Sequence, residues 1–84
     1  MKTWSSEYKG HSIVVQNGLF SGEQLIVDGQ LQDEQLGFAL RARLHGKITN
    51  PTGVSESIKV SLGGWLSVDC RIFVDDQLLP SKRT

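Results

Sequence analysis

The sequence predicts an all-β fold, a small antiparallel β-sandwich or flattened barrel of about seven or eight short strands joined by hairpins. Nine glycines divide the chain into short runs rich in β-branched and aromatic residues, such as HSIVVQ, QLIV, ESIKVSL and WLSVDCRIFV. In the last two runs apolar and polar residues alternate with period two, which is typical of strands with one buried face.

Two-residue hairpin turns are predicted at Asn17-Gly18 and Asp28-Gly29. A type I′ turn needs positive φ at both central residues, and these residue pairs tolerate it. Gly63-Gly64 is a third candidate for such a turn.

A short motif occurs twice, because LIVDGQL at residues 25–31 returns as IFVDDQL at residues 72–78. We interpret the two copies as equivalent hairpin tips. Two-residue turns at Asp28-Gly29 and Asp75-Asp76 then place the same kind of apolar pair beneath each tip, Ile26 with Leu31 and Phe73 with Leu78. Because Asp76 replaces the glycine, the second tip is expected to be more strained, or of a different turn type.

The loop after residue 62 determines which residues of the last strands face each other. A two-residue loop at Gly63-Gly64 would place Val60 opposite Ser67 and mix the apolar and polar faces. We therefore predict a three-residue loop, or a bulge near Trp65, that pairs Leu62 with Leu66 and Val60 with Val68.

The segment 36–44 is ambiguous between a strand and a helix. As a helix it would have Asp33 as its N-cap and an apolar stripe of Leu36, Leu40 and Leu44. A strand is favoured because it also places Phe38 and Ala42 on that apolar face, with Arg41 and Arg43 on the opposite one. The segment 49–55 is predicted to be a turn, and residues 79–84 a frayed tail.

Composition indicates one globular domain over residues 1–84. Nine basic residues balance nine acidic ones, so no overall charge favours nucleic acid or a membrane surface as a partner. The only cysteine, Cys70, excludes an intrachain disulfide, and together with the lack of a signal peptide or apolar span it predicts a cytoplasmic protein.

The turn residues resemble those of the Fas apoptosis inhibitory molecule family. The resemblance lies in NGLFSGEQLIVDGQ at 17–30, GFALRARLHGK at 37–47 and RIFVDDQLL at 71–79. It implies a compact antiparallel β-sandwich without a catalytic site, which acts through protein contacts in the restraint of apoptosis and of protein aggregation. The residues that match by position have structural turn roles: Gly18, Ser21, Gly22, Asp28 and Gly29.

Residues with catalytic or metal-binding chemistry do not form a recognisable motif. Asp28, Asp75 and Asp76 lack the spacing of a calcium loop and are interpreted as turn residues. His11 and His45 are candidates for a general base, but Cys70 falls on the apolar side of its strand, where a thiol is usually inert. We therefore predict no catalytic residue, metal or cofactor.

Two surfaces are candidates for binding. Arg41, Arg43 and Lys47 lie on one side of a strand, and with Arg71 they can form a basic face for an anion or an acidic partner. The alternative is a solvated face with salt bridges to Asp69 or Glu56. The aromatic residues Trp4, Tyr8 and Trp65 either contact a ligand or protein, or close the small core.

These observations predict a non-catalytic module for protein interaction or for structure. Such a module can self-associate into a homodimer through a strand edge or a sheet face. A ligand-binding module for a sugar or an anion is the alternative.

Overall fold

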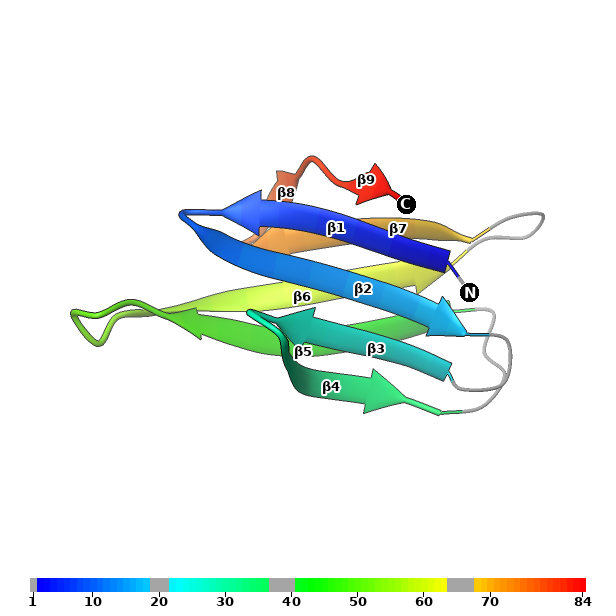
Figure 1. Ribbon diagram of the computed structural model, residues 1–84, viewed down its shortest axis with the longest axis horizontal. Coiled ribbons are helices and arrows are strands. Elements are labelled where there is room, and N and C mark those ends of the chain that lie inside the picture. The colour runs from blue at the N-terminus through cyan, green and yellow to red at the C-terminus, as the bar shows by residue number, and fades with distance from the viewer. Residues whose placement is uncertain (1, 19–21, 37–40, 64–67) are drawn as a thin grey trace.

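The computed structural model describes residues 2–18, 22–36, 41–63 and 68–84, apart from the side chain of Arg41. The described residues form nine strands in two antiparallel sheets that pack face to face, which confirms the predicted all-β sandwich (Figure 1). The five-stranded first sheet has the order β4-β3-β2-β1-β9, and the four-stranded second sheet has the order β5-β6-β7-β8.

The strands of each sheet have the following bounds. The first sheet contains β1 (Lys2–Tyr8), β2 (His11–Gly18), β3 (Gly22–Val27), β4 (Gln30–Gln35) and β9 (Lys82–Arg83). The second sheet contains β5 (Arg41–Thr49), β6 (Ser55–Gly63), β7 (Asp69–Val74) and β8 (Gln77–Leu79).

The core lies between the two sheets and is built from alternate residues of β1, β2, β3, β5, β6 and β7. Its centre in the second sheet is one cross-strand row, in which Leu44 faces Val60 and Val60 faces Ile72. The buried hydrophobic residues are Trp4, Ile13, Val15, Leu25, Val27, Ala42, Leu44, Ile48, Ile58, Val60, Leu62, Ile72 and Val74. Because the sandwich is only two layers thick, all these side chains join a single cluster.

The two acidic hairpin tips have the predicted register. Ile26 faces Leu31 in one hairpin, and Phe73 faces Leu78 in the other. Asp75 and Asp76 both have positive φ, at 47° and 66°, as Asp28 and Gly29 do at 50° and 80°. The expectation of a different turn type at the second tip is therefore wrong, since aspartate tolerates the left-handed region well enough to form the same turn.

Each tip is fastened to the preceding strand by the same pair of hydrogen bonds. The Ser12 amide donates to the Asp28 carboxylate, and the Asp28 amide donates to the Ser12 carbonyl. Ser57 and Asp75 repeat both bonds in the second sheet. The sequence repeat thus extends to HSI at 11–13 and ESI at 56–58, so the meanders β1–β4 and β5–β8 are equivalent halves.

The expected turn at Asn17-Gly18 is wrong, because β2 continues through both residues. Gly18 pairs with Gly22, and the connection consists of residues 19–21, so Ser21 lies outside the described residues. Gly22 has a φ of +81°, and a Cβ atom there would lie 2.2 Å from the Gln35 carbonyl oxygen. Close approach of the next strand therefore requires a glycine at position 22.

The register between β6 and β7 also differs from the expected one. Leu62 faces Cys70 and Val60 faces Ile72, so the predicted pairs with Leu66 and Val68 are wrong. The connection is the five residues 64–68, of which Gly64 and Trp65 lie outside the description. Apolar residues still oppose apolar residues, because an odd loop length preserves the faces whether it is three or five.

Residues 41–44 of the ambiguous segment form a strand, as the start of β5. Ala42 and Leu44 are buried and Arg43 is exposed, as the strand interpretation predicts. Leu36 differs, because it lies outside any strand and is 70% exposed. Phe38 and Leu40 lie outside the described residues. The predicted turn after β5 is confirmed by a bond from the Asn50 amide to the Val54 carbonyl.

The segment expected to fray is instead part of the first sheet. Lys82 and Arg83 form β9 and pair with Ser5 and Trp4 of β1. The Ser6 hydroxyl also donates to the Pro80 carbonyl at 2.7 Å. Backbone pairing with a free sheet edge offsets the entropy of ordering this polar segment, which its composition alone does not suggest.

Candidate functional site: a cationic sheet face

The outer face of the second sheet collects most of the predicted basic residues. Strand alternation that buries Ala42, Leu44 and Leu62 turns their odd-numbered neighbours outward. We call the exposed side chains of Arg43, Lys47, Lys59 and Arg71 the cationic face. Of the residues predicted for it, Arg41 begins β5 opposite Gly63, and its side chain lies outside the description.

Two arginines of the cationic face lie in one register row. Arg43 of β5 faces Ser61 of β6, which faces Arg71 of β7. Since neighbouring strands are about 4.8 Å apart, the two arginines flank the serine hydroxyl from either side. A hollow of about 290 Å³ is lined by all three residues, together with Asp69. This row presents two guanidinium groups and a hydroxyl to a ligand, all of them hydrogen-bond donors.

The adjacent row adds one aromatic surface. His45 faces Lys59, and Lys59 faces Phe73, which is half-buried. Lys59 pairs with Asp76 at 3.3 Å, but both side chains are exposed, so the pair is weak. Within the described part of the chain, the ion pairs found involve neither Arg43 nor Arg71. Asp69 lines the same hollow but forms none of these pairs, so one carboxylate accompanies two guanidinium groups.

The expected aromatic contacts have different roles. Trp4 is 5% exposed and packs in the core, so the interpretation as a binding surface is wrong for this residue. Burying the largest side chain supplies much of the apolar area of a small core. Tyr8 packs partly against the core and directs its hydroxyl to Glu56, and Trp65 lies outside the described residues.

Tyr8, Lys9 and Glu56 connect the two sheets at one end of the sandwich. The Tyr8 hydroxyl donates to one carboxylate oxygen of Glu56, and the Lys9 ammonium lies 3.3 Å from the other. The hydrogen bond from Tyr8, assisted by Lys9, lowers the pKa of the Glu56 carboxyl, and the same bond raises the pKa of Tyr8. Glu56 therefore pairs away from the cationic face, contrary to the expected salt bridge.

This cluster predicts a loss of stability in acid. Because the folded-state pKa of Glu56 is lowered, its stabilising effect is present above the unfolded-state pKa and is lost as pH falls through the folded-state value. We expect the thermal midpoint to fall between pH 5 and pH 3, and to fall less in Glu56→Gln. The pKa of Asp28 is also lowered, by hydrogen bonds from His11 and Ser12. Part of the pH dependence of stability therefore remains in Glu56→Gln. An unchanged acid slope in the variant would contradict this assignment.

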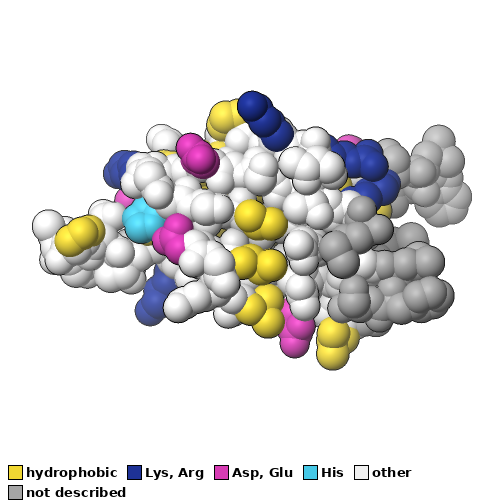
Figure 2. Space-filling view, in the orientation of Figure 1, with side chains coloured by type: hydrophobic (Ala, Val, Ile, Leu, Met, Phe, Trp, Pro, Cys, Tyr) yellow, Lys and Arg dark blue, Asp and Glu magenta, His cyan; other side chains and the backbone are white. Residues whose placement is uncertain are grey.

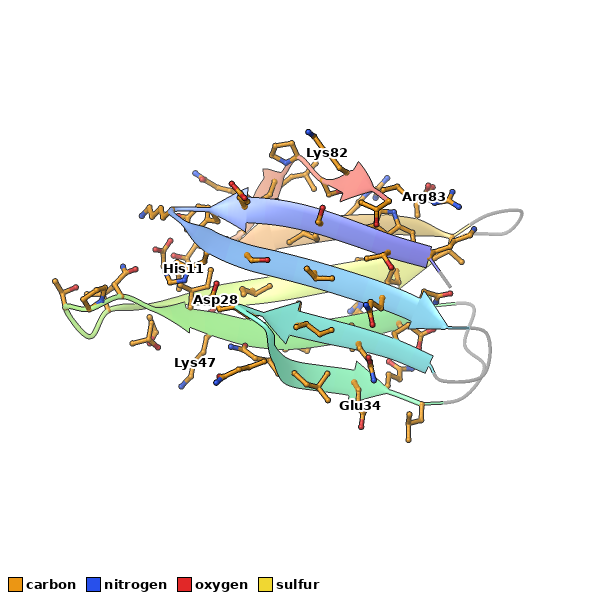
Figure 3. The ribbon with its side chains drawn as sticks, viewed as in Figure 1. His11, Asp28, Glu34, Lys47, Lys82 and Arg83 are labelled. Carbon is orange, nitrogen blue, oxygen red and sulfur yellow. The ribbon has the colours of Figure 1, made fainter. Side chains whose placement is uncertain are left out.

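The histidines and the cysteine that could take part in catalysis or metal binding lie apart from one another in the fold. His11 contacts Asp28 at 2.7 Å on the first sheet (Figure 3), whereas His45 projects from the outer face of the second. Cys70 is partly buried, and burial raises the pKa of its thiol to about 12. Over the described ranges, no three His, Cys, Asp or Glu side chains lie close enough to hold a metal ion.

Sequence reasoning identified Arg43, Lys47 and Arg71 but missed Ser61, Lys59 and Phe73. Those three belong to the site because of cross-strand register, which depends on the 50–54 loop for β5 with β6 and on the 64–68 connection for β6 with β7. Correct pairing of Val60 with Ile72 would have found them, since the outward neighbours follow automatically.

The fold and this surface define a small antiparallel β-sandwich with one cationic face. No family model, curated protein or solved structure matches the chain. The resemblance to the Fas apoptosis inhibitory molecule family therefore stays a prediction. In the part of the chain that the structure describes, no helix has the length and apolar character needed to cross a membrane.

Proposed function

We propose that this protein is a non-catalytic binding module whose cationic face holds an acidic segment of a partner protein. The observation that carries the proposal is the Arg43–Ser61–Arg71 row, in which two arginines without a described ion-pair partner flank a hydroxyl. Guanidinium groups bind carboxylates through paired hydrogen bonds, which gives geometric preference as well as attraction.

The two outer faces differ in character, which favours the second sheet. On the first sheet Val14 faces Ile26 and Ile26 faces Leu31, and hydrophobic side chains cross the middle of this face in Figure 2. The cationic face instead combines exposed charge with the half-buried ring of Phe73. A like-charged copy of the same face would be repelled, so an acidic partner fits it better than a symmetric homodimer does.

A charge-reversal experiment tests this proposal. The probe is a labelled ten-residue peptide of alternating glutamate and threonine, followed by fluorescence anisotropy at 50 mM and 300 mM NaCl. We expect binding that weakens at high salt and falls at least tenfold in the Arg43→Glu/Arg71→Glu variant, because two cations become anions at the contact.

A matched control separates the site from net charge. Lys82→Glu/Arg83→Glu makes the same change in charge on β9, at the edge of the first sheet (Figure 3). This variant should bind within about twofold of the unchanged protein. An equal loss of peptide affinity in both variants would mean that overall charge alone governs binding, and this would overturn the proposed site.

A free inorganic anion is a second candidate, favoured by the hollow between Arg43 and Arg71. Titration with sodium phosphate at constant ionic strength distinguishes the two ligands. Displacement of the peptide by low millimolar phosphate, lost in Arg43→Glu/Arg71→Glu, would support a small-anion site. Displacement by salt alone would leave the acidic segment as the ligand.

A further inference from the structure

The seam between β4 and β5 is bridged by side chains. The register of β4 shifts between Leu25 and Ile26, because Leu25 faces Asp33 while Ile26 faces Leu31. Gln32 is therefore the extra residue of a β-bulge, a feature that bends a strand and re-aims a side chain. β4 packs beside β5, an edge strand of the second sheet, with which it shares no backbone ladder.

Gln32 and Asp33 take the place of a neighbouring strand along β5. The Gln32 side-chain Nε2 donates to the Lys47 carbonyl at 2.9 Å, and the Lys47 backbone amide donates back to Gln32 Oε1 at 2.8 Å. The His45 amide donates to Asp33 Oδ2 at 2.8 Å. Gly46 makes room, since a Cβ atom there would lie 2.3 Å from Gln32 Oε1. Three backbone groups of the β5 edge are thus satisfied by two side chains.

The equivalent edge in the other half, that of β1, is paired with a strand. β1 begins the first meander as β5 begins the second, and β9 pairs with β1 as an added antiparallel strand. The added strand is basic, and its Lys82 lines the same hollow as Glu7 of β1. One edge of this sandwich therefore already binds an extended segment.

We propose that the β5 edge is a strand-addition site for an extended acidic segment, and that Gln32 and Asp33 close it until the segment binds. The segment takes over the backbone groups of His45 and Lys47, and its side chains extend onto the cationic face beside Arg43. A second copy of β5 is disfavoured, since pairing would bring Arg43 and Lys47 of both copies together. This inference rests on the proposed acidic partner and adds the mode of binding.

The experiment uses two forms of the alternating glutamate–threonine peptide, one of them N-methylated at alternate residues. Methylation removes backbone donors but leaves the charge unchanged, so it blocks strand pairing alone. In Gln32→Ala, which removes two cap bonds without altering charge, we expect the unmethylated peptide to bind about tenfold more tightly than to the unchanged protein. Gln30→Ala, on the same strand with an exposed side chain, should leave the affinity within about twofold.

The outcomes separate the two proposals. If both peptides bind Gln32→Ala equally, strand addition is overturned while the acidic-face proposal stands. If only the unmethylated peptide binds but Arg43→Glu/Arg71→Glu has no effect, the face proposal fails and strand addition stands. Failure of both peptides to bind overturns both, and peptide-free dimerisation of Gln32→Ala in sedimentation would make a second copy the occupant, which also overturns the acidic segment.

A second readout applies if Gln32→Ala does not fold. In the unchanged protein, saturation with the unmethylated peptide should alter the amide resonances of His45 and Lys47 and slow their hydrogen exchange. The amides of Leu44 and Gly46 alternate with those of His45 and Lys47 along β5 and point toward β6, so they should change less. Equal changes at all four amides, or none at His45 and Lys47, would contradict strand addition.

Discussion

Replacing Leu44 by alanine is expected to lower the free energy of unfolding by about 2–5 kcal/mol. Leu44 is fully buried, at 0% exposure, between the two sheets and beside Val60. The variant loses the transfer energy of the removed atoms and leaves a cavity that a two-layer core closes only partly. Since small domains are stable by about 5–15 kcal/mol, the loss is a large fraction of the total. Urea unfolding followed by the fluorescence of buried Trp4 measures it.

Leu78→Ala provides the matched control for this prediction. It makes the same substitution at a residue that is 60% exposed, beneath the second acidic tip. We expect a change within about 0.5 kcal/mol, because little area leaves water at this position on folding. Similar losses in the two variants would contradict the assigned core.

Replacing Gly22 by alanine should destabilise the fold by about 2–4 kcal/mol. Two effects add: a φ of +81° is unfavourable for any L-residue, and the new methyl would meet the Gln35 carbonyl oxygen at 2.2 Å. Because the obstacle is backbone, β3 and β4 must separate near this point to relieve the contact. The same unfolding measurement, with hydrogen exchange of the β3–β4 amides, tests the expectation.

Gly53→Ala separates the two effects. Gly53 has a φ of +88° in the loop between β5 and β6, but a Cβ atom there would meet nothing within 4 Å. This variant should lose only about 1 kcal/mol, the cost of the left-handed backbone. A loss at Gly53 as large as that at Gly22 would show that the close contact at Gln35 contributes nothing.

The hairpin tips show what local sequence can predict. Asp28-Gly29 and Asp75-Asp76 were placed correctly together with their register, because turn chemistry and cross-strand pairing are decided within a few residues. The predicted turn at Asn17-Gly18 is wrong, although Asn-Gly favours a two-residue hairpin turn as strongly as Asp-Gly does. There Gly18 and Gly22 pair across the 19–21 connection, a contact that the dipeptide alone does not encode.

The candidate site was predicted in part for the same reason. Alternation along single strands was enough to turn Arg43 and Arg71 outward, but it could not show that Ser61 lies between them. The Gln32 cap depends on a bulge, on the packing of β4 beside β5, and on the space at Gly46. Such features arise only when two sheets are assembled, so a pattern read along one strand cannot reveal them.

The order of strands has a consequence for how the chain reaches this structure. In both sheets each of the described pairings joins strands that are consecutive in the chain, except that of β1 with β9. Hairpins close short loops and form within microseconds, whereas the pairing of Trp4 with Arg83 must close nearly the whole chain. We therefore expect the two meanders to form and dock first, with the β1 edge open until β9 arrives late in folding. During that interval the β1 edge is open to pairing with other chains.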